Sequence, residues 1–131
     1  MNLLIIDDDH IGNCVTHRLA ETSGLFTTIR TLKYERHALE FLEEAESDAS
    51  LKPDLIILNP GMQDISLAHL LDALRELIAE SAKRIYLAIL TLTSDRSALA
   101  CIRATGLQPY LLKPFSSPDL HTMVHALKSR A

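Results

Sequence analysis

The chain has 131 residues, of which 47% are hydrophobic and 23% are charged, and its formal net charge is −4. This length and composition suit one domain, spanning residues 1–131, that buries its own core. The apolar runs are too short for a membrane span or a signal peptide, so we expect a cytoplasmic protein with no membrane partner. The charge is uneven, −7 over residues 1–66 and +3 over residues 67–131. No basic stripe with interleaved aromatic residues is present, which disfavours a nucleic-acid partner.

The first apolar segment, Leu3 to Ile6, predicts a buried strand. The acids Asp7-Asp8-Asp9 end it, because charged groups do not continue into a core. Residues 10–23 then predict a helix that Ser23-Gly24 stops. Three apolar residues recur there at the helical spacing i, i+4, i+8: Ile11, Val15 and Leu19.

The most informative segment lies in the middle of the chain, after a weaker β-branched strand predicted over residues 25–30 and a helix over residues 34–46. Four apolar residues, 55–58, are bracketed by Pro53-Asp54 and by Asn59-Pro60-Gly61. This pattern predicts a short, fully buried strand that ends abruptly in a turn. A helix over residues 67–78 follows.

The second half repeats the alternation of strand and helix. Residues 85–90 predict a buried strand closed by Thr91, and residues 95–105 a short helix. Residues 109–112 predict the last strand. The last helix is expected over residues 117–128, with Ser117 as its N-cap and an apolar stripe of Leu120, Met123, Val124 and Leu127.

Two weaker signals involve cysteine and histidine. Cys14 and Cys101 lie far apart without metal-type spacing, so we expect two reduced thiols buried as small apolar residues. His121 and His125 are four residues apart on the last predicted helix, a spacing that can bind metal. With no third ligand and no catalytic Glu between them, we interpret them as surface residues.

Polar side chains follow the strands at one edge of the predicted fold. Buried strands alternating with helices indicate a parallel sheet covered by helices on both faces. The carboxyl ends of such strands meet at one edge, where ligands bind in open α/β sheets. Five residues are expected there: Asp7, Asp8, Asn59, Thr91 and Lys113.

The same residues resemble the receiver domains of two-component response regulators. The resemblance rests on the acidic run after the first strand, on Pro53 to Met62, on Thr91 and on Tyr-Leu-Leu-Lys-Pro-Phe at residues 110–115. It implies an α/β fold, a flavodoxin-like (βα)5 three-layer sandwich whose five-stranded parallel sheet has the order 2-1-3-4-5. It further implies that Asp7 and Asp8 hold Mg²⁺ and that the residue at position 59 accepts the phosphoryl group. In such domains Thr91 and Lys113 would contact that group, and Tyr110 would rotate as the readout.

Position 59 departs from this family pattern. The family reaction is attack of a carboxylate oxygen on a phosphoryl group, and the neutral amide of Asn59 is not a competent nucleophile. Leu92 stands where a small residue is usual and adds bulk beside the phosphoryl position. Asp8, the Asn59 amide oxygen and the Gly61 carbonyl could still bind Mg²⁺, with Asp7 acting through water, but more weakly because one charge has gone.

We therefore expect a non-enzymatic signalling module, a pseudo-receiver that acts through protein contacts without phosphorylation at Asn59. The family resemblance places its partner or homodimer face on the helix at 95–105, the strand at 109–112 and the helix at 117–128. Two alternatives remain open. One is a receiver that is phosphorylated on another acid, Asp8, Asp9 or Asp64. The other is a flavodoxin-like binder of a small molecule or nucleotide or a Mg²⁺-dependent phosphotransfer enzyme, although no glycine-rich phosphate loop follows any strand.

Overall fold

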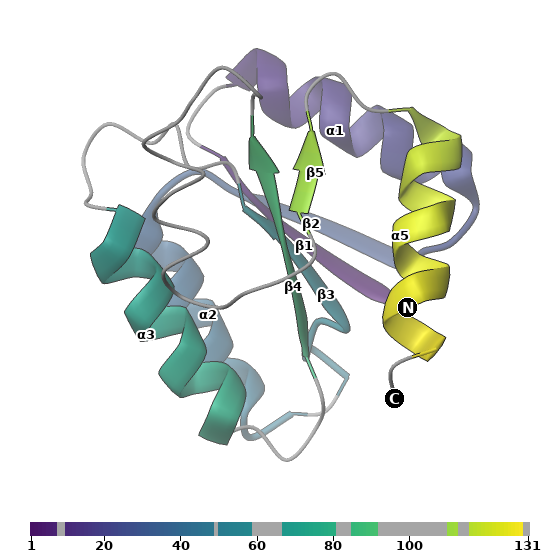
Figure 1. Cartoon of the computed structure of the whole chain (residues 1–131). Helices are drawn as coiled ribbons and strands as arrows, with labels where there is room; N and C mark the ends of the chain where they lie inside the picture. The colour runs from purple at the N-terminus through teal and green to yellow at the C-terminus, as the bar shows by residue number, and fades with distance from the viewer. Residues whose placement is uncertain are drawn as a thin grey trace.

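The computed structural model describes residues 1–7, 10–48, 50–58, 67–80, 85–91, 110–112 and 116–129. A five-stranded sheet forms its centre, and every pair of neighbouring strands is parallel (Figure 1). The strands are β1 (Asn2–Ile6), β2 (Thr28–Leu32), β3 (Leu55–Leu58), β4 (Tyr86–Thr91) and β5 (Tyr110–Leu112). Their order is β2-β1-β3-β4-β5, which confirms the predicted flavodoxin-like topology.

Helices cover both faces of this sheet, as predicted. They are α1 (His10–Ser23), α2 (Glu35–Ala45), α3 (Leu67–Glu80) and α5 (Ser117–Ser129). Figure 1 shows α1 and α5 on one face and α2 and α3 on the other. The helix predicted at residues 95–105 lies outside the described residues. Within the described part of the chain, no helix has the length and apolar character needed to cross a membrane.

The central strands are buried on both faces, which is why they read as unbroken apolar runs. On the α2 and α3 side, Leu4 and Ile6 of β1 pack in one cluster with Ile56 and Leu58 of β3. The alternate residues of the same strands form a second cluster under α1 and α5: Leu3, Ile5, Leu55 and Ile57. All four residues of β3 are at most 1% exposed, which confirms the predicted buried strand.

The strand predicted over residues 25–30 is placed wrongly. The structure has β2 at Thr28–Leu32, and none of its five residues is fully buried. Leu25 and Phe26 instead pack, partly buried, against the cluster under α1 and α5. Because β2 is the edge strand and pairs only with β1, its residues are exposed or half-buried. An edge strand therefore lacks the continuous apolar run that marks the central strands.

Helix α1 has the predicted bounds, but the apolar residues that define its helical spacing do not form its buried face. Ile11 is 73% exposed and Val15 is 55% exposed, and Cys14 is exposed as well rather than buried. Among the side chains of α1 that the structure describes, the buried ones are small: Thr16, Ala20 and Ser23. Ala20 packs in the cluster that α5 completes with Leu120, Met123 and Val124. Small side chains turn inward here because α1 packs beside α5 (Figure 1).

Local capping sets the ends of both helices on this face. Gly24 has φ +72°, the left-handed conformation that ends α1 as the sequence predicted. Ser116, one residue before the predicted Ser117, caps α5. Its backbone N–H donates to Asp119 Oδ2 at 2.8 Å, while the Asp119 N–H donates to Ser116 Oγ at 3.3 Å, a reciprocal capping box. Three residues of the predicted stripe are buried, Leu120, Met123 and Val124, and the side chain of Leu127 lies outside the described part of the chain.

Two polar contacts hold the amino ends of the strands together. The Asn2 backbone N–H donates to Asp54 Oδ2 at 2.6 Å, and Asp54 donates its own N–H to the Asn2 carbonyl at 2.8 Å.

Lys52, in the loop between α2 and β3, is 6% exposed and places its Nζ 3.3 Å from Glu46 Oε2, so its buried charge is paired across the loop. In that loop, hydrogen bonds from the hydroxyl and then the backbone N–H of Ser50 lower the pKa of the Asp48 carboxyl.

Candidate functional site

The register of the sheet brings the carboxyl ends of its strands together. Ile6 of β1 is level with Leu58 of β3, and Leu58 is level with Ile89 of β4. Thr91, the last residue of β4, is level with Leu112, the last residue of β5. These ends define one edge of the sheet, the edge at which open parallel sheets bind ligands.

Asp7 is the acidic residue that the structure places at this edge. It directly follows β1, it is 1% exposed, and its backbone N–H donates to the Leu32 carbonyl at 3.0 Å. That backbone bond ties the end of β1 to the end of β2. The side-chain carboxylate of Asp7 is almost completely removed from water, and a carboxylate in such a place is stable only with hydrogen-bond, ionic or metal partners. The carboxylate chemistry and burial of Asp7 therefore fit a place beside a hard cation such as Mg²⁺.

The other predicted site residues are placed only in part. Thr91 ends β4 as predicted, and Tyr110 begins β5, within the strand predicted over residues 109–112. Only the backbones of these two residues are described. Leu58 ends β3 and Leu112 ends β5, and they directly precede Asn59 and Lys113 in the sequence. The remaining candidate site residues lie outside the described part of the chain. They are Asp8, Asp9, Asn59, Gly61, Asp64 and Lys113.

Sequence reasoning missed an exposed apolar pair on α1. Ile11 and Val15 are one helical turn apart on a helix that begins three residues after Asp7. The signal that could have revealed them is a line of small residues on the same helix, Thr16, Ala20 and Ser23, which competes for the buried face.

His121 and His125 stay on the surface of α5, in agreement with the sequence interpretation. The Nε2 atom of His121 lies 2.8 Å from the carbonyl oxygen of Ser23, so the imidazole bridges α5 to the last turn of α1. This contact gives His121 a structural role. Within the described segments of the chain, no group of three or more His, Cys, Asp or Glu side chains is arranged to hold a metal ion.

Comparison with known proteins explains this arrangement of strand ends. The profile of the response regulator receiver domain matches residues 3–125. The chain belongs to the receiver domain family. Receiver domains are the signalling modules of two-component systems. The match confirms the family that the sequence resemblance indicated. No curated protein matches the chain in sequence.

Solved structures share this receiver fold over nearly the whole chain. A two-component response regulator from Cytophaga hutchinsonii has a TM-score of 0.82 at 19% identity, covering 98% of this chain and 96% of its own. The chemotaxis response regulator CheY4 of Vibrio cholerae has a TM-score of 0.72 at 19% identity, covering 96% and 97%. The receiver domain of the histidine kinase CKI1 from Arabidopsis thaliana, complexed with Mg²⁺ and BeF₃⁻, has a TM-score of 0.78 at 15% identity, covering 98% and 89%.

Proposed function

We propose that this receiver domain is a pseudo-receiver, which signals through protein contacts and is not phosphorylated at position 59. The observation that carries the proposal is the amide at the residue that directly follows β3. An amide oxygen is uncharged and the amide nitrogen lone pair is delocalised, so neither atom can attack a phosphoryl group at neutral pH. The domain therefore acts as a cytoplasmic binding module and not as an enzyme.

In this proposal the metal site is inherited and weakened. Asp8, the Asn59 amide oxygen and the Gly61 carbonyl would bind Mg²⁺, with Asp7 acting through water. Support comes from the buried carboxylate of Asp7 at the end of β1 and from the Arabidopsis receiver domain, which holds Mg²⁺ together with BeF₃⁻. Replacing one carboxylate by an amide removes a unit of charge from the ligand set, which lowers affinity for a divalent cation.

The partner surface of this pseudo-receiver comprises residues 95–105, β5 and α5. Because Leu120, Met123 and Val124 are buried, α5 turns a polar side to solvent that includes Thr122, His125 and Lys128. The carboxyl half of the chain carries the positive balance, +3 over residues 67–131, so this surface suits a partner with an acidic face. Arg96, Arg103 and Arg130 add basic residues to the same half of the chain.

Binding in cell lysate tests this surface. We expect the immobilised chain to retain a specific partner or a second copy equally well with and without a small phosphodonor. Lys128→Glu should reduce retention several-fold, because reversing a charge at an interface places like charges against the partner. Arg18→Glu makes the same reversal at an exposed position of α1 and serves as the control. Retention that requires the phosphodonor, or that both variants weaken equally, would contradict the proposed surface.

A further inference from the structure

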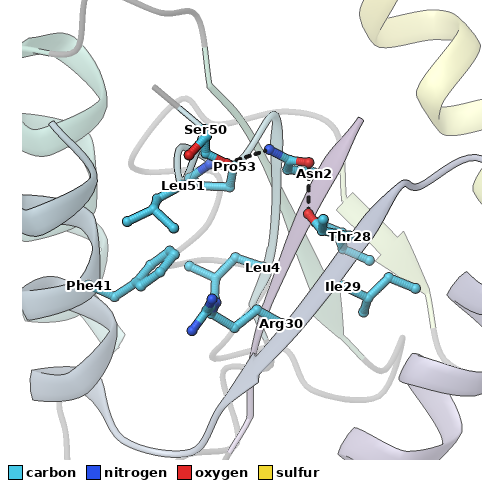
Figure 2. A pocket seen from close by; sticks show the side chains of 10 residues that line it. Asn2, Leu4, Thr28, Ile29, Arg30, Phe41, Ser50, Leu51 and Pro53 are labelled. Atoms are coloured by element: carbon cyan, nitrogen blue, oxygen red, sulfur yellow. Dashed lines mark hydrogen bonds between the residues drawn. The ribbon is translucent and has the colours of Figure 1, made fainter. Parts of the chain in front are cut away.

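A small cavity lies at the opposite end of the strands from Asp7, on the α2 side of β1 and β2 (Figure 2). Its volume is about 200 Å³. The lining comes from the first residues of β1 and β2, from Phe41 of α2 and from the loop that precedes β3. The residues that line the cavity form one polar wall and one apolar wall. Arg30 is the single charged residue among them.

The polar wall is already satisfied by hydrogen bonds within the protein. Asn2 Nδ2 donates to the carbonyl oxygens of Ser50 and Lys52, at 3.3 and 3.2 Å. Asn2 Oδ1 accepts from the hydroxyls of Thr27 and Thr28, at 3.2 and 2.7 Å. These bonds use the amide of Asn2 at both ends. They therefore fix the shape of the cavity and leave recognition of a ligand to other groups.

The charged group, the guanidinium of Arg30, is exposed and contacts an aromatic ring of α2. The Cζ atom of Arg30 lies 4.7 Å from the centroid of the Phe41 ring, a cation–π contact between β2 and α2. Within the described part of the chain, Arg30 forms no ion pair with a carboxylate. Among the described residues no hydrogen bond from the guanidinium is present either, so its N–H groups are available to an acceptor such as a carboxylate.

The apolar wall stands next to this guanidinium. Figure 2 shows Leu51 pointing toward Phe41, with Leu4 of β1 on the sheet side. Leu51 is 37% exposed although it is a large apolar residue, and Pro53 beside it is buried. The loop holds its shape through Ser50, whose N–H and hydroxyl both donate to Asp48 Oδ1, at 3.0 and 2.7 Å. An apolar group bound here would shield the exposed surface of Leu51.

We propose that this cavity binds a small organic carboxylate with an aromatic or apolar body. The carboxylate pairs with the N–H edge of Arg30, and the body lies between Phe41, Leu51 and Leu4. A volume of about 200 Å³ is below that of sites for drug-sized ligands, roughly 300 Å³ and above, which limits the ligand to about a single ring. The site is independent of the proposed function, because it lies at the other end of the strands.

Benzoate is a suitable probe, and titration of the ¹⁵N-labelled chain by NMR measures its binding. We expect saturable shifts in the millimolar range at the amides of Asn2, Arg30 and Leu51. Arg30→Gln should weaken benzoate binding about tenfold or more, because it removes a charge-assisted hydrogen bond. Arg18→Gln, an exposed arginine of α1, is the matched control and should bind as the wild type does.

Benzyl alcohol, which has the same ring without the charge, is the second probe of the wild-type chain. It should bind about tenfold or more weakly than benzoate, since it lacks the anion that Arg30 recognises. Three results would overturn the proposal: no saturable shift at these amides, equal benzoate affinity of wild type and Arg30→Gln, or equal affinity for benzoate and benzyl alcohol. The comparison of the two probes needs no variant and decides the matter even if Arg30→Gln disturbs the fold.

Discussion

Asn59→Asp is expected to strengthen Mg²⁺ binding by about tenfold or more and to lower the melting temperature of the metal-free chain. The substitution adds a negative charge to the set that includes Asp7 and Asp8. Two unit charges about 4 Å apart interact by roughly 4 kcal/mol at an effective dielectric constant near 20. The net change in free energy is smaller because water and Lys113 compensate. The added charge stabilises the metal-bound chain and destabilises the metal-free chain. Isothermal titration with Mg²⁺ and thermal melting in chelator measure the two effects.

The control for this variant is Thr122→Asp, which adds the same charge at an exposed position of α5. It should leave Mg²⁺ affinity unchanged and move the metal-free melting temperature little, since a lone surface charge has small effects. Equal Mg²⁺ affinity and equal melting temperature of wild type and Asn59→Asp would contradict the assignment of position 59 to the metal pocket.

Ile56→Ala is expected to lower the free energy of unfolding by about 2–5 kcal/mol, the usual loss when a buried Ile becomes Ala. Ile56 is 0% exposed in the middle of β3, where helices on both sides leave no room for the core to relax. Ile11→Ala is the matched comparison, because Ile11 is 73% exposed on α1. Its loss should stay within about 0.5 kcal/mol, as for other surface substitutions.

Urea unfolding of the two variants measures this difference. Similar losses for Ile56→Ala and Ile11→Ala would mean that α1 buries the apolar residues that its sequence spacing selects, and that the observed orientation of the helix is wrong. A large loss for Ile56→Ala alone would confirm that β3 is the core of the sheet and that α1 turns Ile11 to the surface.

The central strands and most helices could be predicted because the spacing of their apolar residues reflects which side chains are buried. β1 and β3 are covered on both faces, so each reads as an apolar run that charged or turn residues end. The edge strand β2 was misplaced because it is covered less, and Leu25 and Phe26 imitate the start of a strand while packing against the core from the preceding loop.

The orientation of α1 could not be predicted from the spacing of large apolar residues alone. Ile11 and Val15 satisfy the helical period, but Thr16, Ala20 and Ser23 satisfy it as well. The choice between the two faces depends on how closely α1 packs beside α5, which is a property of the folded chain. Amphipathic spacing selects a helix more reliably than it selects the buried face when small residues compete.

The positions of the strand ends were predictable, and the cavity was not. Asp7, Thr91 and Tyr110 stand at or beside strand ends, as the alternation of strands and helices requires. The contact of Arg30 with Phe41 joins a strand residue to a helix residue across a turn. Neither residue shows an unusual pattern in the sequence, because the pairing arises only when α2 folds back over β2.

Whether position 59 has lost phosphorylation is tested most directly by the intact mass of the wild-type chain after incubation with acetyl phosphate and Mg²⁺. A phosphorylatable receiver domain treated in parallel confirms that the donor is active. We predict an unchanged mass, because the amide of Asn59 cannot take up the phosphoryl group. A stable increase by the mass of one phosphoryl group would contradict the pseudo-receiver assignment and point to another acid, Asp8, Asp9 or Asp64, as the acceptor.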